Sequence, residues 1–535
     1  MNHSVANISA LCDELLLNIF SKLSNIDVLY SFIGINQRFD KLARDITFTQ
    51  SIDLTIISSD KNKNSRTTSI FDRFYLDIIP KIQHNIECFT LDSLSMERVL
   101  CIGNYSKFHK LNLVNLEIET AFHIFNDESS FLHIFEDQIS HLAITISDDS
   151  TAEHIRSLAT KIFTTIFVTF KNLTHLDFEL EDDFVYPPLS LIDLPSTACY
   201  SSNIVELNVR VRNFDDCLCL LDGRLSQLNT FIIKIDKIQN SSKTLDNKKI
   251  LYNLKCFSLI STTRTNAYDT QIVPLLHHMS QLEKLTLSLV AKDRNSFIDG
   301  TQLHNDILYK MAHLHTFIFD ITTRNVIFSQ VILPFSDDVR RTFIERGYHT
   351  DCYIDYYSEG INLCHVYSLP FTMKRMYNVT NSFPGGLFMN VRKLSLSDLF
   401  IPFEHDFFVK ISQAFPLVSQ LALLNMWKQQ KKLTDEQTCS IIEYSHLVQL
   451  SLISAHTDYV KQFLFNSKSH LPCLDTLDVK YQDLITVTDN FTTDAARDNC
   501  AKLKNIIFDA TPFVYSENFY LYFPSFLNVA SCNWR

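Results

Sequence analysis

The chain has 535 residues, of which 48 are basic and 60 are acidic, so its formal net charge at pH 7 is −12. It contains no run of basic residues that could follow a phosphate backbone, which argues against nucleic acid as its main partner. Only eight glycines occur, and neither of the glycine-rich patterns that cradle nucleotide phosphates is present. The composition therefore argues against nucleotide-dependent chemistry.

Two or three short helices are predicted before residue 47. Leu15, Ile19 and Leu23 are spaced four residues apart, as on one face of an amphipathic helix. Ser24 and Asp27 then have the spacing of a capping box, and a second apolar run follows them. Such a small helical module buries little surface and would be stabilised by a partner or by the rest of the chain.

A repeated strand pattern dominates the chain after residue 85. Its clearest copy, Gln281–Leu289, reads QLEKLTLSL, and its last three leucines alternate as the pleat of a strand requires. The copies are spaced by about 22 to 34 residues, close to the roughly 20 to 29 of a leucine-rich repeat. The central apolar residues of the copies, used here as anchors, are Phe89, Leu111, Leu142, Leu176, Leu207, Phe231, Phe257, Leu285 and Phe317, followed after a gap by Leu394, Leu421, Leu450, Leu477 and Ile506.

The repeats predict an α/β fold, a curved leucine-rich-repeat solenoid of the ribonuclease-inhibitor type with a small all-α module at its N-terminus. No copy can bury its own apolar face, whereas stacked copies share one continuous core. A set of unrelated buried strands in an α/β protein is the alternative interpretation. The expected divisions are the helical module at 1–46, a linker and first cap at 47–84, repeats at 85–321, irregular or inserted repeats at 322–390, and repeats with a C-terminal cap at 391–535.

The gap between Phe317 and Leu394 is wide enough for two or three repeats but contains one imperfect copy. Within it, Cys364–Phe371 is predicted as a degenerate strand, and the segment before it is rich in tyrosine. Either degenerate repeats or an insertion would explain the gap, and the tyrosines could fill a core or form an interface. Farther on, His405–Phe415 has the apolar spacing of a helix.

Residues that alternate with the buried ones should line the concave face of the solenoid. The candidate substrate-binding residues on this face are Asp177, Glu179, Glu206, Arg210 and Lys234. Three carboxylates would form an acidic spot flanked by two cations, where a substrate with basic residues could bind; an ordinary solvated surface is the alternative. Other side chains expected on the same face are those of His141, Thr145, His175 and Asn208.

Metal, membrane and catalytic signatures are absent from the sequence. The 13 cysteines form no C-x-x-C pair, so we expect no structural zinc, no cofactor and reduced thiols. No apolar run is long enough to cross a bilayer, and we expect a cytoplasmic or nuclear protein. No G-x-S-x-G or H-E-x-x-H signature occurs, so we expect no intrinsic catalysis. An active site hidden in residues 322–390 remains an alternative.

In its N-terminal segment and in its repeats, the chain resembles the F-box leucine-rich-repeat proteins. The F-box positions are matched by Leu11-Cys12, Glu14, Leu15 to Leu23, Asp27 and Arg38-Phe39. The sequence departs from the family pattern at two of them. Cys12 stands where the family commonly has proline, and Phe39 where many members have tryptophan, which puts the strength of adaptor binding in question.

The resemblance implies a non-catalytic substrate receptor of an SCF-type (cullin–RING) ubiquitin ligase, monomeric within that complex. The F-box would bind the adaptor subunit, and through it a cullin, while the repeats would hold a protein substrate. The adaptor contacts implied by the resemblance are Leu11, Cys12, Leu15, Ile19, Phe20, Leu23 and Leu29. A repeat scaffold that binds a partner without recruiting a ligase is the alternative, and neither function involves nucleic acid or a membrane.

Overall fold

The computed structural model describes residues 8–55, 70–100, 103–126, 134–146, 153–180, 189–191, 194, 199–241, 251–327, 333–357, 361–430, 440–509, 515–523 and 526. The chain forms two compact units. Unit 1 consists of Met1–Thr286 and Ile307–Thr316, and unit 2 of Leu287–Asp306 and Phe317–Arg535. Part of the expected linker, residues 56–69, lies outside the described residues.

Unit 1 begins with a short 3-10 turn, η1 (Ile8–Ala10), and four short helices. These are α1 (Asp13–Phe20), α2 (Asn25–Phe32), α3 (Gln37–Ala43) and α4 (Ile46–Thr49). The predicted cap is confirmed, because the Ser24 side chain accepts a hydrogen bond from the Asp27 backbone N–H at the start of α2. Phe20 is fully buried and stacks on Phe32, with ring centroids 4.1 Å apart. These helices therefore have a small aromatic core of their own.

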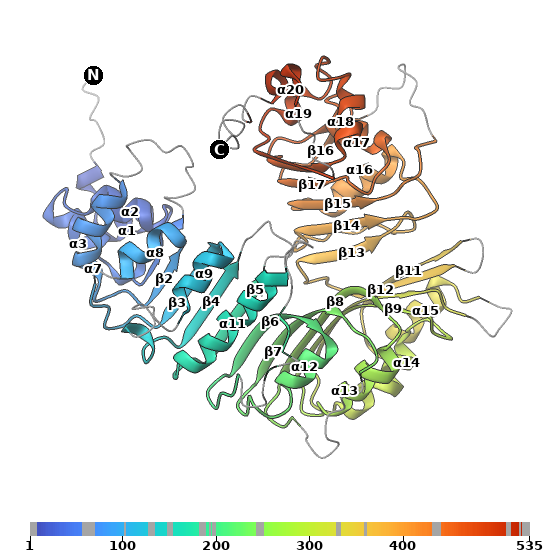
Figure 1. Ribbon diagram of the computed structural model, residues 1–535, viewed down its shortest axis with the longest axis horizontal. Coiled ribbons are helices and arrows are strands. Elements are labelled where there is room, and N and C mark those ends of the chain that lie inside the picture. Colours follow the sequence, from blue (N-terminus) through green and yellow to red (C-terminus); the bar gives the residue numbers. More distant parts are fainter. Residues whose placement is uncertain are drawn as a thin grey trace. The chain divides into compact units, whose positions relative to one another are not determined.

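Parallel strands make up most of the rest of unit 1, and they pair in chain order (Figure 1). They are β1 (Ser51–Asp53), β2 (Cys88–Leu91), β3 (Lys110–Leu116), β4 (His141–Ile146), β5 (His175–Leu180), β6 (Glu206–Asn213), β7 (Thr230–Lys237) and β8 (Cys256–Thr265). The helical segments between and after them include η2 (Phe74–Ile78), α7 (Ile79–Ile82), α8 (Ser93–Leu100), α9 (Ile118–Ile124), α11 (Glu153–Thr169), α12 (Phe214–Leu220), η3 (Tyr268–Ile272) and α13 (Val273–His277). Parallel pairing needs such crossover segments, since a tight hairpin cannot join parallel strands.

The predicted anchor residues occupy equivalent positions in neighbouring strands. Phe89 pairs with Leu111, Leu111 with Leu142, and Leu142 with Leu176, and the series continues to Phe257. Each of these anchors is at most 2% exposed. The predicted alignment of the strand copies is thus confirmed in unit 1, and one row of apolar side chains forms the centre of its core.

The strand β9 (Lys284–Lys292) contains the boundary between the two units, and unit 2 has sheet regions of two kinds. In the first, β12 (Asn362–Ser368) pairs antiparallel with both β10 (Thr316–Arg324) and β11 (Thr350–Tyr356). The second is a six-stranded parallel sheet of β13 (Arg375–Val379), β14 (Lys393–Ser397), β15 (Gln420–Leu424), β17 (Gln449–Ser451), β19 (Thr476–Val479) and β20 (Asn505–Phe508). In this sheet the anchors from Leu394 to Ile506 are again in register.

Shorter elements complete unit 2 and the segment between its two parts. These are α14 (Gly300–Asp306), η4 (Leu308–Lys310), α15 (Ser336–Ile344), α16 (His405–Ala414), α17 (Thr457–Leu464), α18 (Tyr481–Thr488), α19 (Arg497–Cys500), α20 (Glu517–Tyr522) and the strand pair β16 (Ile442–Glu443) and β18 (Ser469–His470). The predicted helix at His405–Phe415 is confirmed as α16. The protein therefore has an α/β fold with large parallel sheet regions.

The irregular region expected at 322–390 contains the antiparallel pair β11 and β12, preceded by α15. The predicted strand at Cys364–Phe371 corresponds to β12, although β12 runs antiparallel to its neighbours. Tyr353 and Tyr367 are buried in the core of unit 2, whereas Tyr356 is exposed. The tyrosines of this region therefore divide between core and surface.

Several irregular positions of the backbone, two of them at register shifts within β3 and β13, have a left-handed asparagine, in a conformation that glycine adopts more readily. Asn115, Asn325, Asn378 and Asn490 have φ between 53° and 57°. Asparagine tolerates this region better than most residues because its short side chain bonds the local backbone. The scarcity of glycine in the chain is thus compatible with these irregular positions.

Candidate functional site

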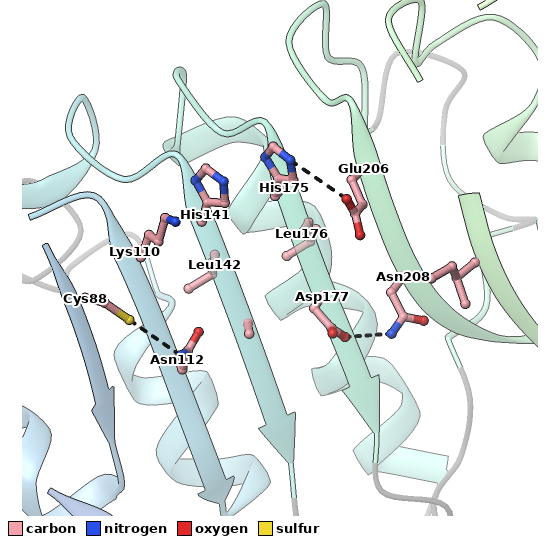
Figure 2. A pocket seen from close by; sticks show the side chains of 12 residues that line it. Cys88, Lys110, Asn112, His141, Leu142, His175, Leu176, Asp177, Glu206 and Asn208 are labelled. Carbon is pink, nitrogen blue, oxygen red and sulfur yellow. Dashed lines mark hydrogen bonds and ion pairs between the residues drawn. The ribbon is translucent and has the colours of Figure 1, made fainter. Parts of the chain in front are cut away.

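A row of polar side chains crosses the face of the unit 1 sheet at one register position. Lys110 of β3 pairs with His141 of β4, His141 with His175 of β5, and His175 with Glu206 of β6. Figure 2 shows these four side chains side by side above the strands, with Cys88 of β2 beside them. Since side chains alternate between the faces of a strand, this row lies opposite the anchors that fill the core.

A second row lies two residues farther along the same strands. It contains Asn112, Ala143, Asp177, Asn208 and Ile232 in successive register positions. Ala143 is the shortest side chain among them, and it stands between the longer Asn112 and Asp177. The two rows together line a hollow of about 280 Å³.

The side chains around the hollow are held by specific contacts. The rings of His141 and His175 are nearly parallel, with centroids 4.0 Å apart. His175 Nε2 lies 3.8 Å from a carboxylate oxygen of Glu206. Asn208 Nδ2 donates a hydrogen bond of 2.9 Å to Asp177 Oδ1 (Figure 2). The carboxylates of β5 and β6 thus lie at one end of the hollow, and the Lys110 ammonium lies on the other side of the two imidazoles.

His141 is the most perturbed titratable group of this face. Its pKa is lowered to about 4, chiefly because burial disfavours the charged imidazolium and also because His175, Lys110 and His109 would be positive beside it. Ser140 Oγ lies 2.8 Å from its Nδ1 and fixes the ring. At neutral pH the His141 ring is therefore an uncharged, hydrogen-bonding surface.

We expect the ring protons of His141 to titrate with a midpoint near pH 4 in NMR spectra of the full chain. The charged form is disfavoured in the folded protein, so protonation needs a pH below the ordinary value near 6.5. A His141→Gln variant assigns the resonance, because the signal with the lowest midpoint should disappear. A His141 midpoint at or above 6.5 would contradict the expectation.

The predicted substrate-binding residues have different environments. Asp177 and Glu206 both line the hollow. Lys234 is half-buried on β7 and does not line it, and the Glu179 side chain lies outside the described residues. Arg210 is only 7% exposed and forms two hydrogen bonds to the Asp236 carboxylate, of 2.8 and 3.0 Å. The prediction that Arg210 contacts a substrate is therefore wrong, because its guanidinium is committed to an internal ion pair.

Some residues of the hollow were not among the sequence-derived candidates. Lys110 and Asn112 belong to β3, which contributed no candidate, and Ala143 offers no chemistry of its own. His141 and His175 were expected on this face but not as parts of a site. The signal that could have identified them is the register of the anchors, since each lies one position before an anchor leucine.

The predicted adaptor contacts divide into exposed and buried residues. Leu15, Ile19 and Leu23 are 50%, 42% and 44% exposed. Cys12 is also exposed, and Leu11 is partly so. Phe20 and Leu29 are completely buried, so the prediction that they touch a partner is wrong. Both face the interior of the helical module, where Phe20 packs against other aromatic rings.

Neither a metal centre nor a membrane span is found in the described part of the chain. Within it, no group of three or more His, Cys, Asp or Glu side chains is placed to hold a metal ion. None of its helices combines the length and apolar character needed to span a bilayer.

No protein-family model matches the sequence, and no curated protein matches it.

Proposed function

We propose that this protein is the substrate-recognition subunit of an SCF-type ubiquitin ligase, with an F-box at residues 1–46 and a leucine-rich-repeat solenoid after it. The observation that carries the proposal is the division of α1 into two apolar faces. Leu16 and Phe20 fill the core of the helical module, while Leu15 and Ile19 remain exposed on the same helix. A short helix with a second apolar face exposed to solvent is typical of a docking surface.

The environment of the two departures from the family pattern also supports the proposal. Cys12 caps α1 with a φ of −69°, which is the value that proline would fix at this position. Phe39 is 7% exposed and packs edge-to-face on Phe20 and Phe32. Cys12 therefore keeps the helix start that proline provides, and Phe39 serves the core of the module.

The N-terminal helices are further tied together by Arg38. Its guanidinium pairs with Asp13 at 2.7 Å and donates to the Leu11 carbonyl oxygen at 2.5 Å. These bonds link α3 to the residues that precede and begin α1. In the proposed function they hold Leu15 and Ile19 in place for the adaptor.

We expect the full chain to bind the SCF adaptor subunit in a pull-down, and a Leu15→Ala/Ile19→Ala variant to lose that binding. Anchor residues of an interface contribute 1 to 4 kcal/mol each on truncation, so the pair should weaken the Kd by at least about 30-fold. Both side chains are exposed, so the variant should fold normally, which circular dichroism checks. Val168→Ala is the matched control, since Val168 is also apolar and 78% exposed on a helix.

An unaltered chain that does not bind the adaptor would overturn the ligase function and leave a repeat scaffold that binds a partner without recruiting a ligase. Equal losses in the Val168→Ala control would mean that the effect is not specific to α1.

A further inference from the structure

We propose that the hollow over Ala143 binds an arginine side chain of a protein partner, with its guanidinium between Asp177 and Glu206. The inference rests on one part of the proposed function, namely that this face of the unit 1 sheet holds a protein substrate. It does not depend on adaptor binding.

The first argument is shape. The hollow exists because Ala143 interrupts a row of longer side chains between Asn112 and Asp177. Its volume of about 280 Å³ is several times the roughly 30 Å³ that one water molecule occupies in the liquid. The hollow therefore has room for a whole side chain inserted from above the sheet.

The second argument is charge. Among the lining residues, Asp177 and Glu206 lie on the neighbouring strands β5 and β6, and Lys110 is the one lysine or arginine. Lys110 is three strands away from Glu206, a separation of about 14 Å at the usual spacing of strands. This exceeds the screening length of about 8 Å at physiological ionic strength, so Lys110 does little to neutralise the carboxylates. The β5–β6 end of the hollow thus favours a cation.

The third argument concerns which cation. A guanidinium is planar, forms paired hydrogen bonds to carboxylates and stacks on flat rings, whereas an ammonium behaves as a compact point charge. His175 offers such a ring next to Glu206, with 3.8 Å between Nε2 and the carboxylate oxygen. The adjoining His141 ring, parallel to that of His175, is uncharged at neutral pH and does not repel a cation. A carboxylate beside a pair of stacked imidazoles favours arginine over lysine.

The test measures fluorescence polarisation of four labelled hexapeptide pools with the full chain. The pools differ only in one fixed central residue, which is arginine, lysine, glutamate or citrulline, the uncharged isostere of arginine. We expect the arginine pool to bind at least 10-fold more tightly than the citrulline and glutamate pools, with lysine between them. Equal binding of the arginine and citrulline pools, tighter binding of the glutamate pool, or no binding of any pool would overturn the proposal.

Two variants and a control locate the site. Ala143→Leu fills the hollow, and Asp177→Asn/Glu206→Gln removes two charges with almost no change in shape, so each should abolish the arginine preference. Ser258→Leu is the matched control, because Ser258 lies in the second row on β8 next to Ile232 but does not line the hollow. An arginine preference that survives in both site variants would also overturn the proposal.

The Leu15→Ala/Ile19→Ala variant separates this inference from the ligase function. It should lose the adaptor but keep the arginine preference, since its substitutions lie in α1. If the unaltered chain failed to bind the adaptor and still preferred arginine, the ligase function would fail and the present inference would stand.

Discussion

Replacing His365 with alanine should lower the free energy of unfolding of unit 2 by about 3 to 5 kcal/mol. His365 is completely buried at the centre of a polar network that joins three strands. The Tyr353 hydroxyl lies 2.6 Å from His365 Nδ1, and His365 Nε2 lies 2.5 Å from an Asp320 carboxylate oxygen. Through these bonds, β12 fastens β11 on one side and β10 on the other.

The expected loss of stability is large because the substitution removes hydrogen-bond partners from buried polar groups. Asp320 is 5% exposed, and without His365 its carboxylate would lose its closest hydrogen-bond partner in a site that water barely reaches. Tyr353 would lose a bond of 2.6 Å, and the bond that it donates to the Asn378 carbonyl oxygen is long, at 3.5 Å. Removing one member of a buried charged network is far more costly than removing a surface pair. A cavity where the ring stood adds to the loss.

Urea denaturation followed by tryptophan fluorescence measures this effect, because Trp427 belongs to unit 2. His349→Ala is the matched control: His349 precedes β11 but is exposed, so its loss should change the unfolding free energy by less than about 0.5 kcal/mol. A Tyr353→Phe variant should show an intermediate loss of about 1 to 2 kcal/mol. Equal stability of the His365 and His349 variants would contradict the role assigned to the network.

The second large effect is expected at the ion pair between Arg210 of β6 and Asp236 of β7. An Asp236→Ala variant should destabilise this part of unit 1 by about 3 kcal/mol or more, because the guanidinium would stay buried without its counter-charge. The side chains of the two residues are 8% and 23% exposed. Hydrogen–deuterium exchange of the amides of β6 and β7 measures the loss, which corresponds to about 100-fold lower protection.

A double variant distinguishes the destabilisation caused by the unpaired buried charge from that caused by lost packing. Arg210 Nη1 has no hydrogen-bond partner in the described part of the chain, so the pair is not fully satisfied even when intact. Apolar replacements of similar size often match a buried pair in stability. Arg210→Met/Asp236→Leu should therefore recover most of the protection that Asp236→Ala loses. A double variant as unstable as the single one would show that packing, and not the unpaired charge, causes the loss.

The strands and their alignment could be predicted from the sequence, because the alternation of Leu285, Leu287 and Leu289 recurs in copies that stack in register. The antiparallel pairing of β11 with β12 could not be predicted from the sequence. Every residue of β12 is buried, so no alternation of apolar and polar side chains marks it, and periodicity cannot give the direction of a strand. The direction follows from a chain reversal between β11 and β12 that the repeat spacing does not contain.

The candidate site could be predicted only in part, for reasons that individual residues make clear. The alternation of apolar and polar residues correctly predicted that Asp177 and Glu206 lie on the face of the sheet opposite the anchors. It did not predict that Arg210 pairs with Asp236 of the neighbouring strand. Ala143 contributes to the hollow because its neighbours in register have longer side chains. Those neighbours lie about thirty residues away along the chain, so local sequence does not reveal the hollow. In α1, spacing alone could not distinguish buried Phe20 from exposed Ile19, since each belongs to a row of apolar residues four apart.

The left-handed asparagines, such as Asn115 and Asn378, have a consequence for the unfolded chain. Glycine loses more backbone freedom on folding than any other residue, and this chain has only eight glycines in 535 residues. At such strand irregularities, where glycine is often found, asparagine adopts the same positive φ but leaves the unfolded chain fewer conformations. The protein therefore loses less backbone entropy on folding at these positions than it would with glycine, and this restriction of the denatured state contributes to its stability.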